Sequence, residues 1–199
     1  MSRPNQVLGV IYGQAIGDAL GLPVEHRTRE QVQQFEAAQP ASGWPHTYME
    51  TIRKDCGWKP GEWSDDTEQA ICILDAYLKG DGKQLDLKIL AKEFLDWAAS
   101  NGRGIGGHTR KVFQHPQFLQ NPISASLDIW LASGRNAAPN GAVMRSAYVG
   151  VLKPWDIPWT AETARQVAAS THYDPRCIAS AVAVGVAVAV LVEGYSPKE

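Results

Sequence analysis

The chain is organised around the sequence Gly61-Glu62-Trp63-Ser64-Asp65-Asp66-Thr67-Glu68-Gln69-Ala70. The residues that follow it are apolar at helical spacing, namely Ile71, Leu74, Tyr77 and Leu78. This periodicity predicts a helix that holds Asp65 and Asp66 in its first turn and ends near Gly80-Asp81-Gly82. Ser64 stands directly before the helix, where a serine side chain commonly caps the free backbone amides.

Two adjacent carboxylates in a first turn have two explanations. As ordinary capping residues, Asp65 and Asp66 interact favourably with the positive end of the helix dipole. As metal ligands they point about 100° apart, too far to chelate one ion from a helix interior, but at a helix start they can bracket one cation or bridge two. Carboxylate and hydroxyl oxygens suit Mg²⁺, Mn²⁺ or Ca²⁺ rather than Zn²⁺. The stretch therefore predicts either a capped helix or a site for a hard metal ion.

Helical patterns extend over most of the chain. Further helices are expected at residues 5–20, 28–38, 86–100, 124–132, 140–152, 160–170 and 178–192. Thr28 and Gln31 have the spacing of a capping box at the start of the second of these helices. Residues 39–62 are rich in Pro and Gly and predict a long irregular loop, which in a compact domain is typically functional or mobile. No stretch alternates polar and apolar residues as a strand does, so an all-α bundle is predicted.

The composition is that of one globular domain. At 199 residues, with 44% hydrophobic and 20% charged residues, the chain is long enough for one substantial core. Its 19 basic and 21 acidic residues create no general attraction to nucleic acid or to a membrane surface. Cys56, Cys72 and Cys177 are odd in number and widely spaced. This argues against a disulfide framework or structural zinc and favours a reducing, cytoplasmic setting.

The sequence predicts no membrane anchor. It does not open with the charged and then apolar segments of a secretory leader. The most apolar run, residues 178–192, has 15 residues, whereas a membrane-spanning helix needs about 20. This run is therefore expected to be a helix that is buried on most sides.

Small and charged residues interrupt the first helix. Gly9, Gly13 and Gly17 recur every four residues, a spacing that favours the close approach of another helix. Asp18 stands in the same apolar segment and needs a partner if it is buried. That partner is either the backbone amides of a neighbouring loop or a metal ligand that Asp18 orients.

Two later segments have features of a binding site. Residues 101–110 are rich in glycine and precede a helical segment, so they either present backbone amides to a phosphate or form a simple flexible connection. Arg145 lies in an otherwise apolar helical run, which favours a carboxylate or phosphate partner. Met144 beside it is expected in the core.

Four motifs occur in a fixed order over most of the chain. They are Gly13-x3-Gly17-Asp18-Ala19-Leu20-Gly21-x-Pro23-x-Glu25, Trp63-Ser64-Asp65-Asp66-Thr67, Asn140-Gly141-x2-Met144-Arg145 and Thr171-His172-x-Asp174-Pro175. In this combination the chain resembles the ADP-ribosylglycohydrolase family, which includes the dinitrogenase-reductase-activating glycohydrolases. The resemblance implies an all-α orthogonal bundle and a site that usually holds two Mg²⁺ ions. It also implies hydrolysis of the bond between ADP-ribose and a protein side chain such as arginine.

The resemblance also implies roles for individual residues. Ser64, Asp65 and Asp66 match metal ligands, with Ser64 where Thr is commoner, and Glu25 matches an acidic residue near the metals in some members. Asp66 or Glu25 would take a proton from water as general base. The positions that match the ADP-ribose cleft are Gly104, Gly106, Gly107, Asn140, Gly141, Met144, Arg145 and His172. The competing interpretation of His172 is a satisfied capping residue at a helix junction.

The sequence after the last apolar helix differs from the family pattern. The family has a second acidic element there, Asp-x-Asp-Thr or Asp-x-Asp-Ser, whereas the acids after Asp174 are Glu193 and Glu199. We therefore expect one domain over residues 1–199 that lacks the family's C-terminal helices and part of the magnesium shell. Such a chain would be weakly active or inactive alone. Apolar surface left uncovered on its last helix would favour association.

Other functions remain open at this point. The second acidic element would come from a longer reading frame or a partner chain, or the protein is a non-catalytic module that binds ADP-ribose or an ADP-ribosylated protein. A prenyl-transferring or terpene-cyclising enzyme also binds magnesium through an Asp-rich helix. It is disfavoured because Gln69 stands where that motif needs a third Asp.

Overall fold

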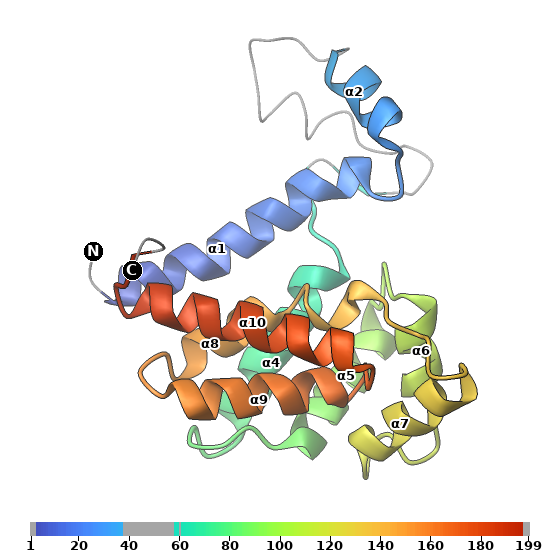
Figure 1. Ribbon diagram of the computed structural model, residues 1–199, viewed down its shortest axis with the longest axis vertical. Helices are drawn as coiled ribbons and strands as arrows, with labels where there is room; N and C mark the ends of the chain where they lie inside the picture. Colours follow the sequence, from blue (N-terminus) through green and yellow to red (C-terminus); the bar gives the residue numbers. More distant parts are fainter. Residues whose placement is uncertain (1–2, 38–57, 60, 197–199) are drawn as a thin grey trace.

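The computed structural model describes residues 3–37, 58–59 and 61–196, and over these residues it contains helices and loops but no strand (Figure 1). The helices are α1 (Arg3–Gly21), η1 (Leu22–Val24), α2 (Arg29–Ala37), α4 (Asp65–Lys79), α5 (Leu87–Ser100), α6 (Gly107–Phe113), α7 (Pro122–Ala132), η3 (Asn140–Ala142), η4 (Ser146–Tyr148), α8 (Val149–Leu152), α9 (Ile157–Ala169) and α10 (Pro175–Val192). The all-α prediction is confirmed. The predicted loop over residues 39–62, with Cys56, lies almost entirely outside the described residues.

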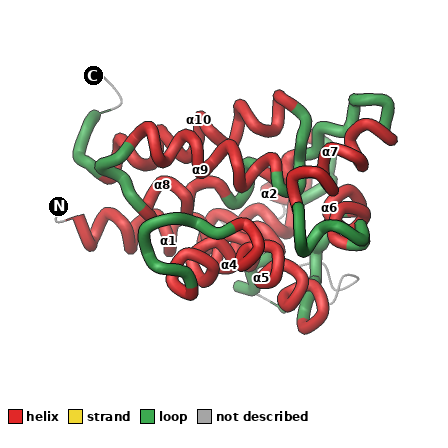
Figure 2. The backbone as a smooth tube through the Cα atoms, turned by 90° about the horizontal axis from the view of Figure 1, so that it is seen from below, coloured by secondary structure: helices red, strands yellow, loops and turns green. Residues whose placement is uncertain are grey.

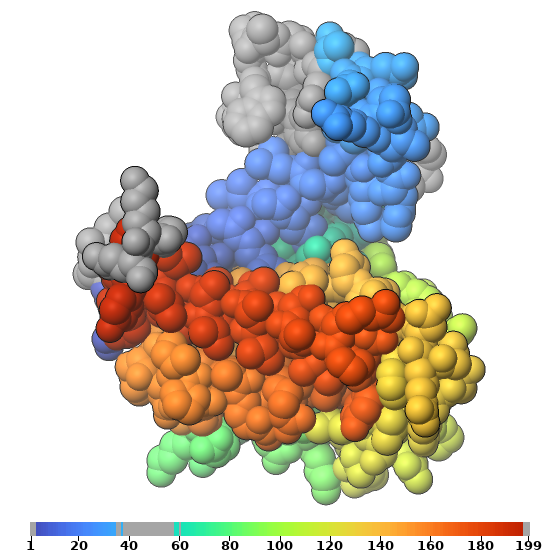
Figure 3. Space-filling model, viewed as in Figure 1, coloured from blue at the N-terminus to red at the C-terminus, as the bar shows by residue number. Residues whose placement is uncertain are grey.

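The bundle is built from two helix pairs. α9 and α10 run antiparallel beside each other, and α4 packs against α5 (Figures 1 and 2). The short α8 contacts α4, α9 and α10 and so joins the pairs, while α1 crosses them and contacts both α4 and α10. α6 and α7 close one end of the bundle. α2 stands away from this body, as the space-filling view shows (Figure 3).

α2 begins with the predicted capping box. The Thr28 amide donates to Gln31 Oε1 over 2.9 Å, and the Gln31 amide donates to Thr28 Oγ1 over 3.3 Å. Two of the free amides at the helix start are thereby satisfied by side chains.

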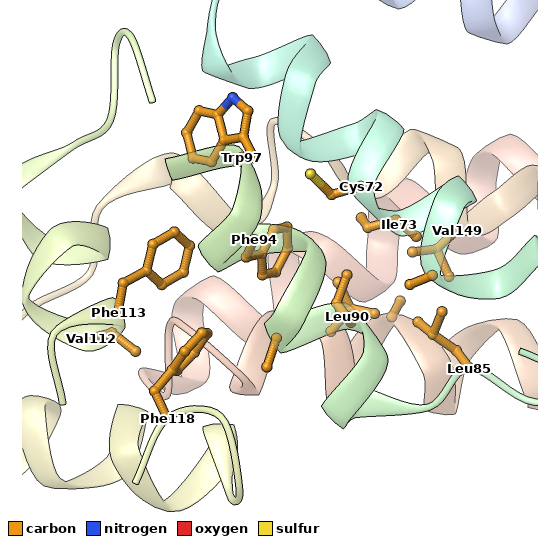
Figure 4. Packing of buried hydrophobic residues seen from close by; sticks show 14 of the residues in the cluster. Cys72, Ile73, Leu85, Leu90, Phe94, Trp97, Val112, Phe113, Phe118 and Val149 are labelled. Atoms are coloured by element: carbon orange, nitrogen blue, oxygen red, sulfur yellow. The ribbon is translucent and has the colours of Figure 1, made fainter. Parts of the chain in front are cut away.

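The core lies where α4 and α5 meet α6 and the loop after it (Figure 4). Its aromatic part is a chain of rings, with Phe94 stacked on Phe113 at 5.6 Å between centroids and Phe113 against Phe118 at 4.9 Å. The face of α5 that meets this core carries the buried residues Leu90, Phe94 and Trp97. Ring pairs of this kind add to the stabilisation that comes from burial alone.

The buried face of α4 differs from the one its large side chains indicate. Leu78 is 74% exposed, whereas Ala70, Ile73 and Ala76 are fully buried. Small residues on this face let α5 and α8 approach closely, and the larger side chains are left on the outer side. Periodicity located the helix but not the orientation of its faces.

The expected helix over residues 140–152 is wrong in part. The chain there forms η3, a turn, η4 and only one turn of α-helix in α8. The 3₁₀ bonds from Val143 N to Asn140 O (2.9 Å) and from Ser146 N to Val143 O (3.1 Å) wind the backbone more tightly than an α-helix does. Gly150 then meets α10 so closely that a Cβ atom would lie 2.5 Å from the Gly185 carbonyl oxygen.

The glycines of α1 do not pack against a helix. A Cβ atom at Gly9, Gly13 or Gly17 would meet no described atom within 4 Å, so the predicted close approach is wrong for the described residues. Three large apolar side chains of this helix are also exposed, namely Leu8, Tyr12 at 64% and Ile16 at 55%. α1 instead contacts the body of the molecule at points along its length, from the Arg3–Glu193 ion pair at its start to Asp18 and the buried Ala19 near its end.

α10 is buried on one face rather than on most sides. Its buried residues are Cys177, Ala181, Gly185, Ala189 and Val192, which form one stripe along the helix. α10 and the segment Arg3–Val24 are each long and apolar enough to cross a membrane. Core helices of globular proteins can have the same length and hydropathy. In this fold α10 packs on α8 and α9.

Asp18 connects α1 to the start of α4. Its carboxylate accepts bonds from the Ser64 amide (2.9 Å) and hydroxyl (2.7 Å), and from the Thr67 amide (3.0 Å) and hydroxyl (2.7 Å). The first of the two interpretations of Asp18, a partner for backbone amides, is therefore confirmed. A carboxylate with four donors at a helix N-terminus is strongly stabilised by charge-assisted bonds and the helix dipole.

We expect Asp18→Ala to lower the free energy of unfolding by about 2–4 kcal/mol, because it leaves buried donors of Ser64 and Thr67 without an acceptor. The matched control is Asp86→Ala, since Asp86 caps α5 through one bond to the Lys88 amide (2.7 Å) and should cost about 1 kcal/mol. Urea denaturation measures both. Equal losses would contradict a special role for Asp18.

Candidate functional site

A cleft of about 600 Å³ opens where the end of α1, the start of α4, the glycine-rich loop and the 139–144 turn come together. Of the residues predicted from the sequence, those that line it are Glu25, Ser64, Asp65, Asp66, Gly104, Gly106, Gly107, Asn140, Gly141, Met144 and His172. Gln14, His26 and His108 line it as well. Segments up to about 150 residues apart in sequence thus form one site.

Asp65 and Asp66 form an acidic wall. Burial, followed by repulsion from Asp66, raises the pKa of Asp65 to about 7. Burial, followed by repulsion from Asp18, raises the pKa of Asp66 to about 6. Glu25 adds to the repulsion on both. These carboxylates are therefore held together at a cost in free energy, which is a common property of functional sites.

Ser64 is the N-cap of α4, as predicted. Its hydroxyl donates to Asp18 Oδ1 over 2.7 Å, with Asp66 Oδ2 a more distant acceptor at 3.3 Å, and its oxygen accepts from the Asp66 amide over 3.4 Å. The capping interpretation of Ser64 is therefore confirmed. Its role as a metal ligand stays a prediction.

The chemistry of the donors fits a hard cation, but the described shell is partial. Asp65, Asp66 and Glu25 offer only oxygen atoms, which Mg²⁺ prefers, and a cation would relieve their mutual repulsion. Over residues 3–37, 58–59 and 61–196, however, no three His, Cys, Asp or Glu side chains are grouped closely enough to hold a metal ion. The donor chemistry of these residues therefore suits a hard cation, but the described residues alone do not form a complete metal site.

The glycine-rich loop packs directly on the acidic wall. Gly104 has φ +83°, and a Cβ atom there would lie 2.5 Å from Asp65 Oδ1, so both the backbone conformation and the contact require glycine. Glu68 holds the start of the loop by accepting bonds from Asn101 Nδ2 (3.0 Å) and from Trp97 Nε1 (2.6 Å). The loop is therefore a fixed wall of the cleft and not a simple flexible connection.

His172 and His108 form a second wall of the cleft, with ring centroids 4.8 Å apart. His172 is 1% exposed and its Nδ1 lies 2.8 Å from Thr171 Oγ1, whereas its Nε2 has no hydrogen-bond partner among the described residues. A Cβ atom on Gly141 would lie 2.8 Å from this Nε2. Burial, followed by the charge of Arg145, keeps the pKa of His172 well below its usual value, so the ring is neutral.

The alternative interpretation of His172 as a satisfied capping residue is therefore wrong. Asp174, not His172, caps α10, with its carboxylate accepting from the Arg176 amide (2.9 Å) and from Trp130 Nε1 (3.0 Å). The sequence reasoning missed His108, whose Nε2 contacts the Thr171 carbonyl oxygen at 3.0 Å. Its position directly after the glycine-rich loop was the available signal.

Arg145 does not line the cleft, which corrects its predicted contact with ADP-ribose. The guanidinium is fully buried, and its partners are Gln69, Thr171 and the Val167 carbonyl oxygen rather than a carboxylate or phosphate. Because the backbone forms 3₁₀ turns here, Met144 lines the cleft and Arg145 points inward. Met144 is accordingly only partly buried, so its predicted core position is also wrong.

Gln14 is a second residue that the sequence reasoning missed. From α1 its Nε2 donates to the carbonyl oxygens of Met144 and of Asp66, the latter over 3.3 Å. It therefore ties the 139–144 turn to the acidic wall. A polar residue one turn before Asp18 was the available signal.

Comparison with known proteins identifies relatives over the whole chain. The family model for ADP-ribosylglycohydrolases matches residues 1–199, which confirms the resemblance found in the motifs. An uncharacterised protein of Escherichia coli K12, YegU, is 28% identical over 98% of this chain and 56% of its own length.

Two named relatives are similar at comparable identity. The ADP-ribosylarginine hydrolase Tri1 of Serratia proteamaculans is 26% identical over 94% of this chain and 48% of its own length. The ADP-ribosyl-[dinitrogen reductase] glycohydrolase of Rhodospirillum rubrum is 29% identical over 98% of this chain and 60% of its own length. The chain spans about half the length of the curated relatives it matches.

The raised pKa of Asp65 predicts how stability depends on pH without divalent cations. The folded protein keeps the Asp65 proton up to about pH 7, whereas the usual value is 3.8, so the free energy of unfolding falls as the pH rises between these values. Asp65→Asn removes this loss. We expect the variant to be about 1–3 kcal/mol more stable than wild type near pH 8, and about equal near pH 4.

Urea denaturation in EDTA at both pH values measures this difference. Asp96→Asn is the matched control, because Asp96 forms a surface ion pair with Lys92 on α5 and lies outside the residues that line the cleft. Destabilisation by Asp65→Asn near pH 8 would show that the acidic wall carries no unfavourable charge.

Proposed function

This chain belongs to the ADP-ribosylglycohydrolase family, and on that basis we propose that the protein hydrolyses the glycosidic bond between ADP-ribose and a modified protein side chain. The named relatives act on ADP-ribosylarginine and on ADP-ribosyl-dinitrogen reductase, as their names state. An ADP-ribosylated arginine is therefore the acceptor that we propose first.

One observation supports the proposal above the others, namely the acidic wall of Asp65 and Asp66 beside Glu25. A general base works best when its pKa is close to the working pH, and without a bound cation the pKa of Asp66 is raised to about 6. A carboxylate with that pKa can accept a proton from water near neutral pH. Asp66 is the proposed base, and Glu25, at the same edge of the cleft, is the second candidate.

The proposed reaction breaks the bond between C1 of the ribose and the acceptor nitrogen. Water attacks C1 from one face, its proton passes to Asp66, and the bonding electron pair leaves with the acceptor nitrogen, which then takes up a proton. Such reactions pass through an oxocarbenium-like state, so they depend on how the sugar and the water are oriented. Asn140, Gly141 and His172, which also line the cleft, are the proposed contacts to ADP-ribose.

Magnesium is part of the proposal. Asp65, Asp66 and the Ser64 oxygen would hold Mg²⁺. When bound, the ion would lower the pKa of a coordinated water and orient the ribose hydroxyls. The resemblance implies two ions. Because the described shell is partial, we propose that further ligands come from outside the described residues.

A non-catalytic ADP-ribose-binding module is the second candidate. It is favoured by the absence, among the described residues, of a group of three metal-binding side chains. The polar wall with the unpartnered His172 Nε2 would be enough for binding. This candidate predicts affinity for ADP-ribose without turnover.

The proposed setting is the cytoplasm, where ADP-ribosylated proteins would be the partners. Cys72 and Cys177, the cysteines in the described part of the chain, are both free and buried. Burial raises the pKa of the Cys72 thiol to about 12, so it is protonated and unreactive. These thiols are compatible with a reducing compartment.

Release of ADP-ribose from an ADP-ribosylarginine substrate in the presence of Mg²⁺ tests the proposed function. We expect Asp66→Asn to lower kcat by about 10²–10⁴-fold, because the base is removed, while the binding of ADP-ribose measured without Mg²⁺ is retained. Asp96→Asn serves again as the control. Turnover that is unaffected by Asp66→Asn would contradict the assignment of the base, and binding without turnover by wild type would favour the module.

A further inference from the structure

Arg145 is the largest fully buried side chain in the described protein. No carboxylate forms an ion pair with it among those residues. Its guanidinium lies over the Phe94 ring, 4.7 Å from the centroid, and its two terminal nitrogens donate to Gln69 Oε1, Thr171 Oγ1 and, over 3.3 Å, the Val167 carbonyl oxygen. Since burial of an unpaired charge is costly, such a residue needs an explanation.

The first branch of this network leads to the acidic wall. A guanidinium has only donors, so the side-chain oxygen of Gln69 must face Arg145. The Gln69 amide nitrogen is then turned the other way, and it donates to Asp65 Oδ2 over 3.1 Å. Gln69 is fully buried. By fixing the orientation of the Gln69 amide, Arg145 determines that Asp65 Oδ2 meets an N–H donor. This bond in turn fixes the orientation of the Asp65 carboxylate.

The second branch leads to the histidine wall. Thr171 Oγ1 accepts a bond from Arg145, so its hydroxyl proton is available to donate. The one other partner found for this hydroxyl in the described structure is His172 Nδ1, at 2.8 Å. A neutral imidazole whose Nδ1 accepts carries its proton on Nε2. Arg145 therefore leaves His172 with an N–H donor at the nitrogen that faces Gly141.

We propose that Arg145 is a positioning residue that sets the hydrogen-bond polarity of both walls of the cleft, that is, which atoms donate and which accept. It acts on Asp65 through Gln69 and on His172 through Thr171. The polarity is a property of the fold and is independent of the proposed function. Its catalytic consequence rests on that function, because one wall would hold the metal and water and the other an oxygen of ADP-ribose. The planar fork of arginine suits this task, since two separate nitrogens bind two separate acceptors.

A merely structural Arg145 makes a different prediction. If it only fills space on Phe94, removing one branch changes the stability of the protein without selective effects on the walls. If it sets polarity, removal of the Thr171 hydroxyl affects the histidine wall, and removal of the Gln69 amide affects the acidic wall. The two branches are separated in the chain, so each can be removed alone.

The tautomer of His172 is the most direct test of the second branch. Long-range ¹H–¹⁵N NMR spectra of histidine-labelled protein distinguish a proton on Nε2 from one on Nδ1. We expect the Nε2–H form in wild type and a mixture of forms in Thr171→Val, which has nearly the same shape but no hydroxyl. The matched control is Thr160→Val, because Thr160 is equally buried in α9 and its hydroxyl bonds the Lys153 carbonyl oxygen.

The Nδ1–H form in wild type would overturn the proposal, and so would identical spectra for Thr171→Val and Thr160→Val. The measurement needs neither ligand nor turnover. Failure of the protein to hydrolyse ADP-ribosylarginine would therefore refute the proposed function and leave this inference intact.

Binding of Mn²⁺, followed by electron paramagnetic resonance, tests the first branch. We expect Gln69→Leu to weaken Mn²⁺ binding by about 10-fold, as is usual when a partner of a metal ligand is removed, with the His172 tautomer unchanged. Thr171→Val should leave Mn²⁺ binding unchanged. Gln166→Leu is the control, because Gln166 bonds Glu162 on the surface of α9.

Arg145→Lys completes the test, since lysine keeps the charge but not the fork. We expect it to weaken Mn²⁺ binding and to mix the His172 tautomers together. If this variant does not fold, the two single-branch variants still decide. Equal effects of Gln69→Leu and Thr171→Val on both measurements would show that the network only supports the fold, and would overturn the proposal.

Discussion

The carboxylate of Asp18 is the contact on which the site depends. It comes from α1, yet it binds the amides and hydroxyls of Ser64 and Thr67 at the start of α4. A side chain of α1 therefore satisfies backbone amides at the start of α4. The position of α1 across the bundle is thereby coupled to the position of Asp65 and Asp66. Because η1 and Glu25 follow directly after α1, the same contact brings a third acidic side chain to the cleft.

The gathering of these acids is opposed by burial and repulsion, and the rest of the fold must stabilise it. The aromatic core beneath α4 and α5 provides apolar burial, and Glu68 fastens the glycine-rich loop against Asp65. Arg145 lies inside this arrangement and provides a buried positive charge that reaches Asp65 through a neutral amide. Both walls of the cleft are thus connected to one guanidinium, which explains how residues so far apart in sequence keep a common geometry.

The sequence predicts the helices and most of the cleft, and its errors have physical causes. Of the twelve site residues predicted from the sequence, eleven line the cleft, and Arg145 is the exception. The prediction for Arg145 was wrong because the direction of its side chain depends on the 3₁₀ turns within residues 140–152. No local sequence pattern encodes these turns. The predicted close approach of a helix to Gly9, Gly13 and Gly17 was wrong because close packing needs a partner surface. Nothing in the sequence of the helix itself specifies such a surface. The backbone amides that bind Asp18 were one of the two partners considered from the sequence, because a carboxylate that is shielded from water demands donors wherever it lies.

Calorimetric titration of ADP-ribose into the protein, with and without excess Mg²⁺, tests the central claim that the acidic wall and the polar wall form one site. The double variant Asp65→Ala, Asp66→Ala is measured beside wild type. We expect binding that Mg²⁺ strengthens by at least about 10-fold in wild type, equivalent to about 1.4 kcal/mol, and that loses its Mg²⁺ dependence in the variant. Binding that responds neither to Mg²⁺ nor to the double substitution would contradict the account.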